Sequence, residues 1–328
     1  MIKEIFIYKS DCTDPYRNIA TEKYLLETVG EGCCILYLWQ NKNTVVIGRN
    51  QNAWVECRTT LLDQEGGKLA RRLSGGGAVY HDLGNLNFTF LLRDEDYDVD
   101  KQLSVIRAAC AKRGLDVIKS GRNDLLVDGK KFSGNAFYHS QGHAYHHGTL
   151  LVSVDKEKLS RYLTPSKAKL ESKGVSSVRS RVANLTEFCP DLTCSELCNH
   201  MASAFGEVYG FDPQPITLSQ EAEERIALYS EELSRWEWLY GPRLPFSFSC
   251  SDRFSWGSIE LQLQVEGGHI RHAQVYSDAM DWELADTIAR VLTGCRFNIA
   301  DMCHMLETVP GDPTIYEDIC VLLKSQDI

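Results

Sequence analysis

The densest group of residues that could do chemistry lies between Arg71 and Asn85. The stretch reads RRLSGGGAVYHDLGN, with two arginines before Ser74 and three consecutive glycines after it. Consecutive glycines let backbone N–H groups turn toward a bound anion, and arginine forks onto phosphate or carboxylate oxygens. Neither common nucleotide loop is present, because no Gly-Lys-Ser/Thr follows and no Gly-x-Gly-x-x-Gly opens a helix. The stretch predicts an anion-binding loop, and the alternative is a flexible surface hairpin.

A second polar stretch, residues 120–135, contains Asp128-Gly129 between two extended runs, which is a strong hairpin signal. A two-residue turn there predicts four cross-strand pairs: Val127–Lys130, Leu126–Lys131, Leu125–Phe132 and Asp124–Ser133. Alternation then places Lys131, Ser133 and Asn135 on one face, with Asp124 as a diagonal neighbour of Lys131. A lysine held by a carboxylate stays charged, which suits binding of a carboxylate or phosphate oxygen. The alternative is an exposed hairpin with an ordinary surface ion pair.

Four histidines fall within residues 139–147, where a further strand is expected. Alternation puts His147 and Thr149 on one side of this strand and His146 on the other. No cysteine or carboxylate lies inside the run to complete a closed metal site. We therefore interpret these histidines as substrate contacts or as satisfied interior residues, and we assign no metal ligand.

In their order and spacing, these motifs resemble the lipoate–protein ligase A family. The resemblance rests on six segments: RRLSGGGAVYHD at 71–82, GRNDL at 121–125, KFSGNA at 131–136, HHGTLL at 146–151, LWQNKNTVVIGRNQN at 38–52 and SVRSRVANL at 177–185. The resemblance covers essentially the whole chain, including Trp236-Glu237-Trp238 and the segment near Ser255-Trp256-Gly257. The set of motifs is specific, although any one segment alone is weak.

The resemblance implies an enzyme that activates lipoate with ATP to lipoyl-AMP and then transfers the lipoyl group to a lysine. The implied acceptors are apo lipoyl domains of 2-oxoacid dehydrogenase complexes or the H protein of glycine cleavage. It implies Lys131 as the catalytic residue, which binds adenylate together with Arg72, Gly77, Ala78, Val79 and Tyr80. The expected lipoate-binding residues are Gly76, Lys131 and His147, with Ser74, Asn85, Asp124 and Ser133 in supporting positions. Magnesium is expected with the ATP, through an unassigned ligand.

Other readings share parts of this pattern. Octanoyltransferases and lipoyl amidotransferases use a cysteine nucleophile, whereas this chain has no cysteine between Cys110 and Cys189. Biotin ligases share the lysine hairpin but use a Gly-Arg-Gly-Arg type of loop that is absent here. A lipoate sensor or carrier would not need the phosphate-binding groups. A transferase that uses preformed lipoyl-AMP would keep the same pocket and stays open.

Composition narrows the class of protein. The net charge of −10 over 328 residues argues against a non-specific nucleic-acid partner. No run approaches the roughly twenty apolar residues of a membrane span, and the start reads as a strand, not a signal. Twelve cysteines, many in apolar surroundings, fit reduced thiols in a cytosol. We expect a cytoplasmic protein with no membrane or nucleic-acid partner.

Short connections indicate an α+β fold. Asp14-Pro15 predicts a helix that runs to about Val29, and hairpin signals predict a mixed, mostly antiparallel sheet flanked by helices. This is the large domain of a biotin/lipoate ligase-like fold, and its last helix is expected near residues 219–240. A linker that contains glycine and proline separates this large domain, residues 1–246, from a small α+β C-terminal domain, residues 247–328. The basic, serine-rich segment 164–183 predicts a loop that closes over an anionic intermediate, and the alternative is a solvated linker.

Overall fold

The structure is a computed structural model of the chain, and it describes residues 1–121, 123–164, 182–241 and 247–326. The chain divides into two compact units, which are described separately. Unit 1 is made of Met1–Val46, Trp54–Arg71 and Ala78–Leu239; unit 2 is made of Ile47–Ala53, Arg72–Gly77 and Tyr240–Ile328. The expected division at 246/247 stays a prediction. Most of the expected closing loop, residues 165–181, lies outside the described residues.

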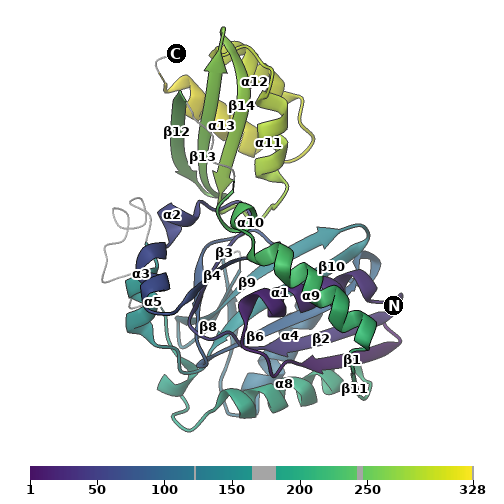
Figure 1. The fold of residues 1–328 in the computed structure, drawn as a ribbon. Coiled ribbons are helices and arrows are strands. Elements are labelled where there is room, and N and C mark those ends of the chain that lie inside the picture. Colours follow the sequence, from purple (N-terminus) through teal and green to yellow (C-terminus); the bar gives the residue numbers. More distant parts are fainter. Residues whose placement is uncertain (122, 165–181, 242–246, 327–328) are drawn as a thin grey trace. The chain divides into compact units, whose positions relative to one another are not determined.

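A large sheet forms the centre of unit 1 (Figure 1). In the described part of the chain it has eight strands, in the order β11-β1-β2-β6-β10-β9-β8-β7. The strands are β11 (Gln214–Pro215), β1 (Glu4–Lys9), β2 (Cys33–Trp39), β6 (Asn85–Arg93), β10 (His143–Leu151), β9 (Lys130–Ser140), β8 (Asp124–Val127) and β7 (Ile118–Ser120). Pairing is parallel at β11/β1 and β1/β2 and antiparallel elsewhere, which confirms the predicted mixed sheet.

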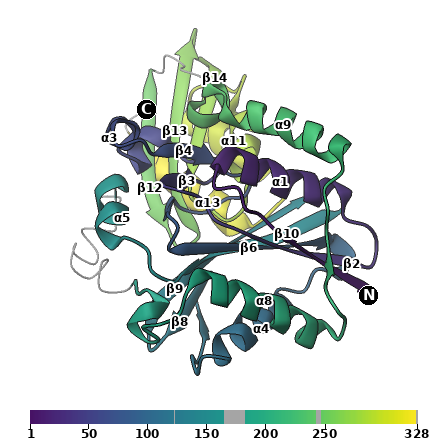
Figure 2. The same ribbon diagram turned by 60° about the horizontal axis from the view of Figure 1, so that its bottom comes forward.

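Helices cover both faces of this sheet, as Figure 2 shows. Helices α1 (Pro15–Thr28) and α9 (Gln220–Ser234) pack together on one face; α4 (Val99–Ala111) and α8 (Cys194–Tyr209) pack together on the other. The α4/α8 face is the apolar core, where Phe88, Phe90 and Phe132 are fully buried. The α1 face carries buried polar side chains as well, and polar groups are buried only where partners or a ligand satisfy them.

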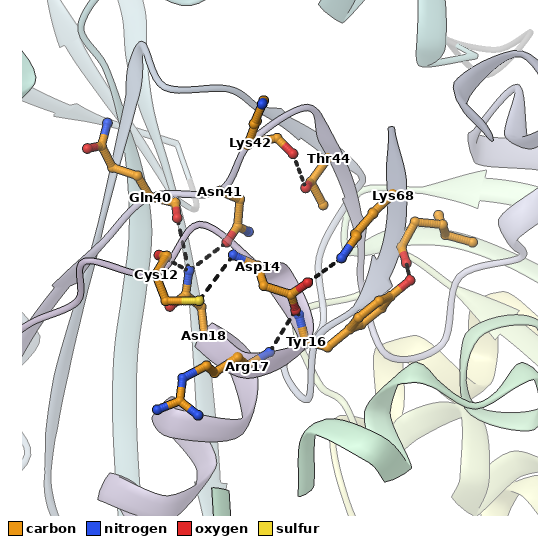
Figure 3. A network of polar contacts seen from close by, with 11 residues as sticks. Cys12, Asp14, Tyr16, Arg17, Asn18, Gln40, Asn41, Lys42, Thr44 and Lys68 are labelled. Atoms are coloured by element: carbon orange, nitrogen blue, oxygen red, sulfur yellow. Dashed lines mark hydrogen bonds and ion pairs between the residues drawn. The ribbon is translucent and has the colours of Figure 1, made fainter. Parts of the chain in front are cut away.

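Polar contacts anchor the beginning of α1 (Figure 3). Asp14 caps the helix as predicted, because its Oδ1 accepts hydrogen bonds from the backbone N–H groups of Tyr16 and Arg17. Its other carboxylate oxygen pairs with Lys68. Asn18, fully buried, donates from Nδ2 to the carbonyls of Cys12 and Gln40 at 3.0 and 2.9 Å. These bonds fix the helix face that carries Glu22, one turn further on.

A small sheet of β4 (Lys68–Arg71), β3 (Thr44–Ile47) and β5 (Val79–His81) leads into and out of the glycine-rich stretch. We call residues Arg72–Gly77, which join β4 to β5, the glycine loop. Short helices accompany the small sheet and the ends of unit 1: α2 (Ala53–Glu56), α3 (Thr59–Gln64), α5 (Lys156–Tyr162) and α10 (Trp236–Tyr240), with 3-10 turns at Asp94–Asp96 and Leu185–Glu187.

The helix expected over 219–240 is interrupted. Arg235 has an extended backbone and separates α9 from α10. Arg71 accounts for the break, because its guanidinium donates to the carbonyls of Trp238 and Leu239 at 2.8 and 2.6 Å. The Trp238 ring N–H in turn donates to the Arg71 carbonyl at 3.0 Å. A tertiary contact thus sets the direction of the last turn.

Unit 2 contains the expected small α+β fold. Among its described residues, β12 (Phe248–Phe254), β13 (Gly257–Glu266) and β14 (His269–Ser277) form an antiparallel sheet. Helices α11 (Leu284–Leu292), α12 (Ile299–Glu307) and α13 (Pro313–Lys324) complete a core around Leu261 and Leu263.

All twelve cysteines lie in described segments and are free thiols. No helix in the described ranges combines the length and the apolar character needed to cross a bilayer.

Candidate active site

Lys131 and Asp124 face each other across the hairpin of β8 and β9. The Lys131 Nζ lies 2.6 Å from Asp124 Oδ1, and both side chains are about one-third exposed. Gly134 makes room for this arrangement, because a Cβ on it would lie 3.3 Å from Nζ. The predicted lysine–carboxylate pair is present. The Lys131 ammonium lies against Gly134, and the lysine side chain stays partly exposed to solvent.

The predicted register of this hairpin is correct at its turn and wrong beyond it. Val127 pairs with Lys130 and Leu126 with Lys131, but a β-bulge follows, so that Leu125 pairs with Ser133 and Asp124 with Gly134. The bulge arises because two successive residues of β9, Phe132 and Ser133, are both fully buried.

The extra residue reverses the faces beyond the bulge. Gly134, and not Ser133, is therefore the residue beneath Lys131. Ser133 and Asn135 turn away from Lys131, toward the face that carries His146. The prediction that they share the face of Lys131 is wrong.

His147 lies on the α1 face of β10, where a buried acid holds it. Its Nδ1 is 2.8 Å from Glu22 Oε1, which also accepts a hydrogen bond from Thr89 Oγ1 at 2.7 Å. The Trp39 ring N–H donates to the same Thr89 oxygen at 3.2 Å. Sequence reasoning missed Glu22, because Thr21 and Lys23 flank it and nothing in the local pattern singles it out as a buried acid.

Further along the same face, buried polar atoms have no hydrogen-bond partner among the described residues. Asn85 donates to Asn87 Oδ1 at 2.8 Å, which leaves Asn85 Oδ1 and Asn87 Nδ2 unpaired; Glu22 Oε2 is also unpaired. Buried polar atoms of this kind are unfavourable until something satisfies them. Thr149, which accepts a hydrogen bond from the Gly134 N–H at 3.2 Å, joins this strip to Lys131. The α1 face therefore brings Lys131, Asp124, His147 and Asn85 together.

The glycine loop is folded around its own arginine. The buried Arg72 donates from Nε to Ser74 Oγ at 3.1 Å, and from Nη2 to the carbonyls of Gly75 and Gly77 at 2.7 and 2.8 Å. By satisfying these carbonyls, the guanidinium turns them inward. This orients the loop and places Arg72 and Ser74 at its base.

Two positions of the loop in unit 2 favour glycine, Gly75 because of close packing and Gly76 because of its backbone conformation. A Cβ on Gly75 would lie 2.3 Å from the Ala279 carbonyl oxygen, and the Gly76 N–H donates to that oxygen at 3.0 Å. Gly76 has φ +87°, a left-handed conformation that favours glycine. Around Gly77, by contrast, a Cβ would meet no atom within 4 Å. Gly77 is therefore the part of the loop where a ligand can approach the backbone.

The last three predicted adenylate residues follow the loop in unit 1. Ala78 and Val79 are partly exposed, with Val79 paired to Val46 in the small sheet. Tyr80 is buried and its hydroxyl donates to Asn43 Oδ1 at 3.0 Å. Burial raises the pKa of the Tyr80 hydroxyl, so it stays a neutral donor. Tyr80 thus anchors the strand, and its backbone is the part that a ligand would contact.

Comparison with known proteins identifies the family to which this fold and this strip of polar residues belong. Residues 14–206 match the family described as the lipoyl protein ligase A/B catalytic domain, and residues 244–319 match the bacterial lipoate protein ligase C-terminus. The lipoate–protein ligase A of Psychrobacter cryohalolentis is 41% identical over 304 residues, 90% of either chain. That of Blochmanniella pennsylvanica is 40% identical over 297 residues, 88% of either chain. The chain belongs to the lipoate–protein ligase A family, as its motifs indicate.

Solved structures agree with this family. P. falciparum LipL1, determined in complex with lipoate, is 27% identical with a TM-score of 0.85, and the match covers 98% of this chain and 100% of that one. A lipoate–protein ligase A bound with ATP is 26% identical with a TM-score of 0.64, over 74% and 99% of the two chains. A bi-partite ligase from Thermoplasma acidophilum, described with its E2 lipoyl domain, is 27% identical with a TM-score of 0.66, over 76% and 100%.

Proposed function

We propose that this protein is an ATP-dependent lipoate–protein ligase. The carboxylate of lipoate attacks the α-phosphorus of ATP, pyrophosphate leaves, and lipoyl-AMP forms. The amine of an acceptor lysine then attacks the acyl carbonyl, an amide forms, and AMP leaves. The observation that carries the proposal is the charged Lys131, fixed by Asp124 on the sheet face that also holds His147.

Lys131 has the properties that both steps need. Joining two anions requires a cation to offset their repulsion, and the acyl carbonyl oxygen gains negative charge when the acceptor amine attacks. Asp124 directs the Lys131 ammonium, and Gly134 lets it lie close to the sheet. A cation held in this way requires no reorganisation as charge develops.

The glycine loop supplies backbone donors for the nucleotide. The open surroundings of Gly77, followed by the accessible backbone at Ala78 and Val79, suit close approach of phosphate oxygens. Arg72 shapes the loop by donating to the carbonyls of Gly75 and Gly77. Its positive charge favours an anion at the same loop.

The polar strip on the α1 face suits the lipoate end of the intermediate. The buried rings of Trp39 and Tyr37 stack with their centroids 5.8 Å apart on the same face, so the strip lies beside apolar side chains. His147, held by Glu22, and the unpaired amide atoms of Asn85 and Asn87 supply fixed polar contacts. Together they offer fixed polar contacts to a bound lipoyl group.

Magnesium and the acceptors complete the proposal. Mg²⁺ in nucleotide sites takes one or two carboxylates plus phosphate oxygens, and Asp124 is a carboxylate that fits this role beside Lys131. When bound, the ion would neutralise phosphate charge during displacement of pyrophosphate.

The acceptors are apo lipoyl domains of 2-oxoacid dehydrogenase complexes or the glycine cleavage H protein. We place the reaction in the cytoplasm, which fits the free thiols.

Lipoate-dependent release of pyrophosphate from ATP tests the first step directly. The protein is mixed with ATP and Mg²⁺, with and without lipoate, and pyrophosphate is measured. Release that depends on lipoate supports the ligase. No release, combined with transfer from supplied lipoyl-AMP to a lipoyl domain, would replace the ligase by a transferase that uses preformed lipoyl-AMP.

A further inference from the structure

A buried histidine that the proposed reaction does not use lies on the opposite face of the same sheet. His146 follows Tyr145 on β10 and is fully buried among the rings of Phe88, Phe90 and Phe137, at centroid distances of 5.3, 6.0 and 5.0 Å. Burial lowers the pKa of His146 from 6.5 to about 3. The imidazole is therefore neutral at physiological pH, and it has one N–H to donate.

Two amide side chains fix the position of that proton. His146 Nε2 lies 2.8 Å from Asn135 Oδ1, and Nδ1 lies 3.0 Å from Oε1 of Gln102 on α4. The Asn135 amide cannot be reversed, because its Nδ2 donates to the Asn123 carbonyl at 2.9 Å. The proton therefore lies on Nε2 and is donated to Asn135. Nδ1 then carries no proton and can only accept, so we assign the Gln102 amide in the reversed orientation, in which its otherwise unpartnered nitrogen donates to Nδ1.

Asn135 passes this constraint to the strand end that carries Asp124. Three hydrogen bonds join Asn135 to Asn123: N–H to carbonyl at 2.9 Å, Nδ2 to the same carbonyl at 2.9 Å, and Asn123 Nδ2 to the Asn135 carbonyl at 2.8 Å. Asn123 directly precedes Asp124, and Asn135 directly follows Gly134. The bonds therefore clamp β8 to β9 immediately beyond the bulge.

We propose that His146 is a positioning residue for Lys131, acting through Asn135 and Asn123 from the far face of the sheet. The inference rests on the proposed role of Lys131 in both steps. Without the Nε2 donor, the Asn135 amide loses the partner that holds it toward Asn123, and the clamp loosens. Asp124 and Gly134 then hold the Lys131 ammonium less firmly, although neither contacts His146.

The test compares three variants at a temperature well below unfolding. His146→Leu removes the donor and keeps an apolar side chain in the core. His146→Gln keeps an N–H that can reach Asn135. Phe90→Leu is the matched control, since it loosens the same aromatic cluster and touches none of the amides.

Turnover and the labelling of Lys131 are measured for each variant. The kinetic measurements give kcat and KM for lipoate-dependent pyrophosphate release and for transfer from lipoyl-AMP. Labelling is the rate at which a limiting acetylating reagent modifies Lys131, with Lys130 in the same peptide region as the internal standard. The labelling needs no substrate, so it reports on Lys131 even if the protein proves to have another activity.

We expect His146→Leu to lower kcat of both steps about tenfold or more, since small misplacements have large effects, with KM nearly unchanged. Lys131 labelling should rise toward that of Lys130. His146→Gln should recover most of both losses, and Phe90→Leu should lower the melting temperature with kcat and labelling preserved.

Unchanged Lys131 labelling in His146→Leu overturns the proposal, and so does unchanged kcat in an active protein. Equal losses of kcat in Phe90→Leu would also overturn it, because they would reduce the effect to core stability. An inactive wild-type protein would contradict the proposed function, and the labelling would still decide whether His146 positions Lys131.

Discussion

At the scale of single residues, the sequence predicted the central pair and missed what surrounds it. The turn at Asp128-Gly129 is set by local backbone preference, so the pairs next to it and the contact of Lys131 with Asp124 follow from spacing. The bulge depends on burial of Phe132 and Ser133 in a core formed by distant segments, which spacing does not contain. Glu22 was missed for the same reason, since its partner His147 is far away in the sequence.

Replacement of the two neighbouring lysines should separate their roles. Lys131→Ala should abolish both lipoyl-AMP formation and transfer from supplied lipoyl-AMP, because it removes the cation held by Asp124. Lys130→Ala should change little, because Lys130 is exposed and its carboxylate neighbour is Glu187, at 3.8 Å. Single-turnover assays of each step measure both variants. Similar losses of activity in the two variants would contradict a specific role for Lys131.

The buried imidazole of His146 should make the protein less stable in acid. Its pKa is about 3 in the folded state and near 6.5 in the unfolded chain, so only the unfolded chain takes up a proton between these values. Stability is therefore lost as pH falls from 6.5 toward 3, by about 2 kcal/mol at pH 5. Urea unfolding should show this extra loss in the wild type and not in His146→Gln. Parallel pH dependence in both proteins would contradict it.

At the scale of elements, the sequence predicted a boundary correctly where residues next to that boundary form it. Asp14 and Pro15 begin α1 as expected, because the cap bonds lie within one turn. The break at Arg235 was not foreseen, because it depends on Arg71, far away in the sequence. The glycine loop combines both situations. Its composition predicted an unusual backbone, but only the structure shows which of its glycines are required by neighbouring residues.

Alanine substitutions within the glycine loop should differ in their effect on folding. Gly75→Ala should lower the free energy of unfolding by about 1–3 kcal/mol, a typical effect of overpacking, because its Cβ would meet the Ala279 carbonyl oxygen. Gly77→Ala meets no atom within 4 Å and should leave the melting temperature nearly unchanged. Thermal unfolding followed by circular dichroism compares them. A melting temperature of Gly75→Ala equal to the wild type would show that the loop is not held against Ala279.

At the scale of the whole molecule, the motifs indicated the family and the sequence predicted two parts. It did not indicate which segments of the chain group together in each part. Residues 47–53 and the glycine loop group with the C-terminal residues in unit 2, although the sequence places them within the first third of the chain. Hydrogen bonds from Gly76 to Ala279 and from Ser277 to Asn50 account for this grouping. Such contacts join positions more than two hundred residues apart, and no local pattern encodes them.

The most direct test of the account is the mass of an acceptor after reaction. An unmodified lipoyl domain is incubated with the protein, lipoate, ATP and Mg²⁺, and its intact mass is measured alongside mixtures that lack ATP or contain Lys131→Ala. The account predicts that the mass of one lipoyl group is added, on one lysine, only in the complete mixture with the wild-type protein. A lipoyl domain that stays unmodified in the complete mixture, or that is modified equally without ATP, would contradict it.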